Sequence, residues 1–165
     1  MESKLIIIRG NSGSGKTTTA KNLQAHLGRG NLLVSQDTVR RDMLKVRDRE
    51  GNLSIDLIRQ IAEYGKDKCE FVIVEGILYS YYYGEMLHGL IEFFDRKSYT
   101  FYFDLPFEET LKRHNSSPKK SEFGEESLRT WWNPKDYLGV ENEISLTEEM
   151  SQKDVLEVIL KQIEK

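Results

Sequence analysis

The chain has 165 residues, of which 38% are hydrophobic and 31% charged, and its formal net charge is −3 at pH 7. That size and balance are typical of one globular domain, and the acidic charge counts against a dedicated nucleic-acid binder, which is more often basic. A single cysteine excludes a disulfide within the chain. The apolar run Leu5–Ile8 is too short for a signal peptide or a membrane span, so we expect one cytoplasmic domain over residues 1–165.

Short apolar runs alternate with segments of helical periodicity along the whole chain. The first half predicts strand Leu5–Ile8, helix Lys16–Leu27, strand Leu32–Val34, helix Thr38–Leu44 and helix Ser54–Lys66. The second half predicts strand Phe71–Val74, helix Gly84–Phe94, strand Tyr99–Phe103, helix Pro106–Asn115, a short strand Asn142–Leu146 and helix Ser151–Ile163. Such alternation implies parallel βαβ units, so we expect an α/β fold with a doubly wound parallel sheet of about five strands and helices on both faces.

Polar residues near the helix starts predict how several helices begin. Asp37 would cap the helix that follows it, Ser54 would cap its own helix, and Asp104 precedes a proline that suits a first helical turn. Ser151 and Asp154 have the spacing of a capping box at the start of the last helix. Capping thus offers a purely structural explanation for both Asp37 and Asp104.

One motif predicts chemistry directly, because the residues from Gly10 to Thr17 match the P-loop pattern G-x-x-x-x-G-K-[ST] without exception. Its glycines let the backbone wrap closely around phosphate oxygens, and successive N–H groups then form an anion-binding nest at a helix N-terminus. Lys16 should reach the β- and γ-phosphates of ATP, and the Thr17 hydroxyl should be a ligand of Mg²⁺. The residues expected to bind the nucleotide are Gly10, Asn11, Ser12, Gly13, Ser14, Gly15, Lys16, Thr17 and Thr18.

A carboxylate follows the second predicted strand, at Asp37. In a parallel sheet the carboxyl ends of the first two strands open onto one crevice, so Asp37 and the P-loop should face each other. A carboxylate there can accept the proton of a substrate hydroxyl while the γ-phosphoryl group moves. Asp37 is therefore both a candidate general base and a candidate helix cap.

The sequence resembles the small P-loop kinases, in particular the kinase domain of polynucleotide kinase and the zeta-toxin-like and chloramphenicol-phosphotransferase-like proteins. The likeness extends from Leu5 to about Asn115. In that group the aspartate after the second strand is the general base and an arginine three residues later helps to hold the acceptor, which implies those roles for Asp37 and Arg40. The segments that carry the resemblance are Gly10–Thr17, Ser35-Gln36-Asp37-Thr38-Val39-Arg40, Phe103-Asp104-Leu105-Pro106 and Lys112-Arg113-His114-Asn115.

The resembling kinases close a lid over the nucleotide, and the matching part of this chain is a lid and acceptor segment at about residues 113–136. Arg113 lies late in a predicted helix, before a polar loop that contains Lys119 and Lys120, and these cations would stabilise the transferring phosphoryl group. A helix C-terminus also favours arginine through its dipole, so Arg113 has a structural alternative. Arg129, beside two tryptophans, is the best candidate for substrate contact later in the lid.

Glu75 ends the third predicted strand, where P-loop proteins carry an acid that holds Mg²⁺ through water. Contact with the acceptor is the other functional hypothesis for Glu75, and a solvated strand end is the structural one. Together the residues predict an ATP- and Mg²⁺-dependent kinase that phosphorylates a hydroxyl of a small molecule, nucleoside or nucleotide. The alternatives are a nucleic-acid 5′-hydroxyl kinase, a nucleotide hydrolase or switch, and a protein that binds nucleotide without turnover.

Overall fold

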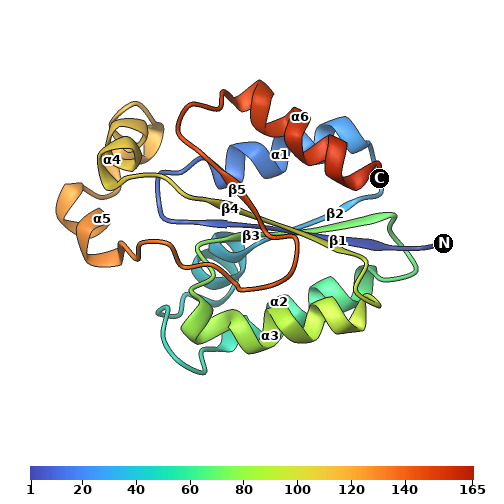
Figure 1. The fold of residues 1–165 in the computed structure, drawn as a ribbon. Coiled ribbons are helices and arrows are strands. Elements are labelled where there is room, and N and C mark those ends of the chain that lie inside the picture. The colour runs from blue at the N-terminus through green and yellow to red at the C-terminus, as the bar shows by residue number, and fades with distance from the viewer.

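All five strands of the sheet run parallel, in the spatial order β2-β3-β1-β4-β5, in the computed structural model of residues 1–165 (Figure 1). The chain thus visits the middle of the sheet first and adds strands on both sides, as a doubly wound fold does. This arrangement confirms the predicted α/β fold. The strands are β1 (Lys4–Gly10), β2 (Leu32–Ser35), β3 (Phe71–Gly76), β4 (Ser98–Phe103) and β5 (Ile144–Leu146).

Helices cover both faces of this sheet, and two further helices lie beyond the carboxyl ends of its strands (Figure 1). One face is covered by α1 (Lys16–Leu27) and α6 (Gln152–Ile163), and the other by α2 (Leu53–Gly65) and α3 (Ser80–Phe93). The helices beyond the strand ends are α4 (Phe107–Asn115) and α5 (Glu125–Trp131). Two short helical segments complete the structure, the π-helical η1 (Thr38–Leu44) and the 3₁₀-helical η2 (Pro118–Ser121).

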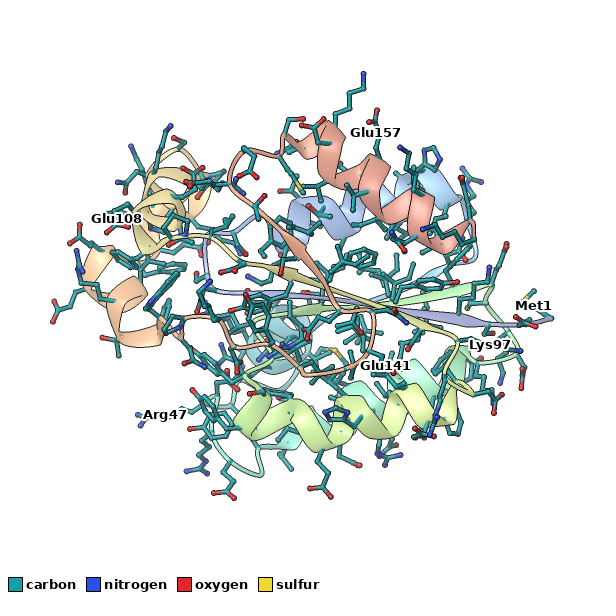
Figure 2. The ribbon with its side chains drawn as sticks, viewed as in Figure 1. Met1, Arg47, Lys97, Glu108, Glu141 and Glu157 are labelled. Carbon is teal, nitrogen blue, oxygen red and sulfur yellow. The ribbon has the colours of Figure 1, made fainter.

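The hydrophobic core has two layers because successive side chains of a strand point to opposite faces of the sheet. Ile6 and Ile8 of β1 pack under α1 and α6, whereas Leu5 and Ile7 pack over α2 and α3, and none of the four is exposed. On α6 the polar face turns outward, as the labelled Glu157 shows (Figure 2). Both layers hold the strands rigidly, so the loops at their carboxyl ends have a fixed base.

Some helix starts differ from the sequence prediction. The cap of α2 is Asn52, whose side chain accepts a hydrogen bond from the Ser54 backbone N–H at 2.9 Å, so the prediction of Ser54 as the cap is wrong. Asp104 is not a cap either, because Pro106 precedes α4 and the Asp104 carboxylate binds Lys135 at 3.0 Å. The capping box at Ser151 is confirmed.

One helix begins earlier than the sequence indicated, and another was not predicted. α3 begins at Ser80 rather than Gly84, and its first turns contain three consecutive tyrosines. α5 forms where no helix was predicted, in the segment with the two tryptophans. None of the helices combines the length and the apolar character that crossing a bilayer would require.

Candidate active site

The P-loop joins β1 to α1 and needs glycine at two of its positions. Gly13 has a φ of 83°, and a Cβ there would lie 2.6 Å from the carbonyl oxygen of Thr110. Gly15 has a φ of 99° and serves as the N-cap of α1 without any capping side chain. Any other residue at either position would be strained, because L-amino acids rarely adopt a positive φ.

The backbone of this loop is a cradle of free hydrogen-bond donors. None of the N–H groups from Asn11 to Thr18 donates to a backbone carbonyl or to a side chain. The Ser14 hydroxyl, which is fully buried, also lacks a partner. Unpaired donors at the N-terminus of a helix bind anions, so the loop suits a polyphosphate.

Lys16 is buried beside this cradle. Only 8% of the residue is exposed, and its ammonium group donates to the carbonyl oxygen of Asn11 at 2.9 Å. Burial lowers the pKa of Lys16 to about 8, because the charged form loses its hydration, while the nearby carboxylates of Glu75 and Asp37 oppose the shift. An incoming phosphate would supply the negative partner that this ammonium group lacks.

Thr17 and Glu75 meet at the carboxyl end of the sheet, where the Thr17 hydroxyl donates to Glu75 Oε1 at 3.1 Å. Glu75, the penultimate residue of β3, lies opposite Ile8 of β1 and Ser35 of β2. Only 2% of it is exposed, which rules out a solvated strand end. A hydroxyl and a carboxylate are oxygen ligands of the kind Mg²⁺ takes, directly or through its waters, together with nucleotide phosphates. These two residues therefore fit a Mg²⁺ ion bound with ATP.

Asp37 follows β2 and lines the same cavity as Thr17 and Glu75, a space of about 530 Å³ between α1, β2, η1 and η2. Its backbone is helical and its side chain makes no capping bond, so the prediction of a cap is wrong. The carboxylate instead lies 3.7 Å from Arg41 Nε and 3.7 Å from Lys119 Nζ. The Asp37 carboxylate therefore lies near two cations while it lines the cavity.

Arg40, the residue implied for acceptor binding, lies outside the lining of this cavity, and Arg41 lies within it. Arg40 donates to the carbonyl oxygen of Val46 at 3.0 Å. The cause is the π-helical form of η1, whose wider turn places the residue four positions after Asp37, rather than three, on the same side of the helix. The sequence contains both arginines, and the local structure of η1 determines which of them lines the cavity.

The segment predicted to form a lid, residues 113–136, reaches the site through two of its cations. Arg113 donates to the carbonyl oxygen of Ser14 in the P-loop at 2.7 Å and to Glu109 at 2.9 Å. Lys119 lines the cavity and pairs with Asp37. Of the predicted lid cations, Arg113 thus lies at the P-loop and Lys119 at Asp37, whereas Lys120 does not line the cavity.

Arg129 is not brought to the cavity. Its side chain is 63% exposed, binds Glu125 at 3.1 Å and lies over the Phe107 ring at 4.4 Å. The two tryptophans pack against different residues. Trp132 packs edge-on against Phe107, whereas Trp131 packs against Phe123 beneath Arg41.

The sequence did not predict two side-chain contacts that join the P-loop and the end of β1 to the segment after α5. The side chain of Asn11 donates to the Asn133 carbonyl and accepts from the Asn133 N–H, both at 2.8 Å. Next to it, the buried Arg9 pairs with Asp136 at 2.8 Å. Neither pair leaves a signal in the sequence, because more than a hundred residues separate the partners.

A family described as an AAA domain matches residues 5–130 of this chain. No curated protein has a sequence that matches it.

Several solved kinases share the fold. The APS kinase of Mycobacterium tuberculosis, solved with AMPPNP and APS, has a TM-score of 0.71 and 16% identity, with 99% of both chains covered. A gluconokinase from Sinorhizobium meliloti 1021 has a TM-score of 0.68 and 13% identity, covering 99% of this chain and 93% of that one. Shikimate kinase from Acinetobacter baumannii, solved with shikimate, has a TM-score of 0.61 and 20% identity, covering 98% of this chain and 93% of that one. At such identities the likeness shows a common architecture.

Proposed function

This chain belongs to the family described as an AAA domain, and on that premise we propose that it is an ATP-dependent kinase of a small hydroxyl-bearing acceptor. We propose that residues 1–165 form one kinase domain similar to the polynucleotide kinase, zeta-toxin and chloramphenicol phosphotransferase group. One observation carries the proposal. Asp37 lines the same cavity as Thr17 and Glu75, so a carboxylate able to act as a base adjoins the cradle for the nucleotide.

In this proposal the donor half of the site is the P-loop. The free N–H groups from Asn11 to Thr18 bind the phosphates, and Lys16 pairs with the β- and γ-phosphate oxygens. Thr17 and Glu75 hold Mg²⁺, which when bound neutralises charge on those oxygens. Arg113, already hydrogen-bonded to Ser14, adds positive charge beside the group in transit.

The acceptor half is centred on Asp37. Its carboxylate takes the proton of the acceptor hydroxyl as that oxygen bonds to the γ-phosphorus, while the bond from phosphorus to the bridging oxygen breaks and ADP leaves. Arg41 and Lys119 hold the carboxylate in place for this step. A cavity of about 530 Å³ lies within the range of small-molecule sites, which supports a small acceptor over a nucleic-acid end.

The decisive experiment is a screen of nucleosides, sugars, antibiotics and 5′-hydroxyl oligonucleotides with γ-labelled ATP. We expect label to be transferred to a small hydroxyl compound. Transfer only to oligonucleotides would favour a nucleic-acid kinase, and ATP consumption without a labelled product would favour a hydrolase.

Once an acceptor is identified, the variant Asp37→Asn tests the role of Asp37 as the general base. The variant should bind ATP nearly as the wild type does but lose transfer by about 10²- to 10⁴-fold, the usual contribution of a general base. Asp56→Asn, which removes a surface carboxylate of α2, is the matched control and should keep full activity. Undiminished transfer by Asp37→Asn would remove Asp37 from the mechanism.

A further inference from the structure

Arg41 makes three contacts, two with rings of the lid segment and one with Asp37 at the start of its own helical segment, η1. Its guanidinium carbon lies 5.9 Å from the centre of the Phe123 ring and 5.7 Å from that of Trp131, both in the lid segment. Its Nε lies 3.7 Å from Asp37 Oδ1. One side chain of η1 therefore contacts both the lid and the carboxylate proposed as the base.

The aromatic surface under Arg41 is a built part of the lid. Phe123 and Trp131 meet edge-on with ring centres 5.0 Å apart, and Phe123 also stacks on the buried His114 at 4.7 Å. The Tyr79 hydroxyl donates to the Trp131 carbonyl at 2.5 Å. The two rings are thus packed against other parts of the chain, and the guanidinium lies within cation–π distance of both.

We propose that Arg41 is a positioning residue that couples closure of the lid to the orientation of Asp37. This inference rests on the proposed function, because the orientation of Asp37 matters only if it accepts a proton from an acceptor. A planar guanidinium can lie over aromatic rings while its N–H groups point at a carboxylate. The compact ammonium group of lysine cannot make both contacts in this geometry.

The contacts are weak enough for the lid to open. Arg41 and Asp37 are 39% and 43% exposed, so water screens their attraction. When the lid opens, Arg41 loses both rings, and Asp37 also loses Lys119, its second cation. An open lid would also admit water, which competes with the acceptor for the phosphoryl group.

Fluorescence of Trp131 tests the contact with the lid, whatever the reaction. Trp132→Phe leaves Trp131 as the one tryptophan, and in that background Arg41→Lys should raise acrylamide quenching because the indole loses its cover. Because lysine cannot cover both rings and also reach Asp37, the ratio of open to closed lid should rise about tenfold. Arg59→Lys, which alters an arginine paired only on α2, is the control and should leave quenching unchanged. Equal quenching in the two variants would overturn the proposal.

Kinetics test the coupling to Asp37. Arg41→Lys should lower kcat for transfer about tenfold, leave the Kd for ATP unchanged, and raise the ratio of ATP hydrolysis to transfer. A structural defect alone would instead lower Tm and weaken ATP binding. Increased quenching with an unchanged kcat and hydrolysis ratio would overturn the coupling. If the wild type phosphorylates no acceptor, the proposed function fails and the coupling with it, and quenching alone then decides whether Arg41 holds the lid.

Discussion

Lys16 is a buried cation whose ammonium group has only a backbone carbonyl as a partner. Removal from water lowers its pKa to about 8, so in the free protein it begins to lose its charge just above neutral pH. A bound polyphosphate would stabilise the charged form and raise that pKa again. Nucleotide binding at this residue must therefore be linked to the uptake of a proton.

This linkage predicts that nucleotide affinity falls as the pH rises above about 8. Below that pH Lys16 is already protonated, so affinity should be nearly flat. Above it, binding must take up a proton, and affinity should fall by up to about tenfold per pH unit. Calorimetric titration with a non-hydrolysable ATP analogue between pH 7 and pH 9.5 measures the slope. Lys16→Met should bind the nucleotide more weakly, and its affinity should not depend on pH. If the affinity of the wild type did not change over this pH range, the assignment would be contradicted.

Among the secondary-structure elements, α6 shows how a local sequence signal and a packing surface act together. Its Val155, Ile159 and Ile163 are buried against the sheet, at the spacing of one helical face. At its start, Ser151 and Asp154 exchange hydrogen bonds of 3.0 and 3.1 Å. The cap satisfies backbone donors that the first turn would otherwise leave to water.

Removal of this cap predicts a modest loss of stability without loss of the fold. Ser151→Ala should lower the free energy of unfolding by about 1 kcal/mol, the usual contribution of an N-cap side chain. Urea unfolding measures the change through the shift of its midpoint. Gln152→Ala, at the next position but outside the cap, should differ from the wild type by less than about 0.5 kcal/mol. A Ser151→Ala loss no larger than that of Gln152→Ala would mean that packing alone holds α6.

At the scale of the whole molecule, Arg9 fastens the end of the lid segment, at Asp136, to the centre of the sheet. Arg9 precedes the P-loop and is completely buried, and its guanidinium binds the Leu78 carbonyl and Asp136. Burial lowers the pKa of Arg9, and Asp136 and Glu143 oppose that shift. Asp136 also accepts a hydrogen bond from the Ser80 N–H at 2.9 Å. The pair therefore joins β1, α3 and the segment after α5 into one unit below the active site.

Loss of the carboxylate predicts a large destabilisation, because a buried guanidinium would lose its counter-ion. Asp136→Ala should lower the free energy of unfolding by about 3–5 kcal/mol, a large part of a typical domain's stability. Asp56→Ala breaks an exposed ion pair on α2 and should change stability by about 1 kcal/mol or less. Urea unfolding monitored by circular dichroism compares the two. If Asp136→Ala lost no more than Asp56→Ala, the Arg9 pair would not be what holds this segment.

Signals carried by neighbouring residues were sufficient to predict most of the fold. The apolar strands, the P-loop pattern and the capping box at Ser151 each depend on residues within one turn or one strand, so the sequence contains them in full. The doubly wound parallel sheet followed from the order of those elements. The bounds of α1, Lys16–Leu27, agree with the prediction because the motif marks its start and Gly28 its end.

Contacts between distant residues could be decided only by the tertiary structure. The π-helical turn of η1 selects Arg41 over Arg40, and the docking of the lid places Lys119 at Asp37 while it leaves Arg129 outside the cavity. The pairing of Asn11 with Asn133 joins residues far apart in the chain. Local propensity determines the elements, whereas the site depends on how packing and buried charges hold those elements together, and no short stretch of sequence contains that information.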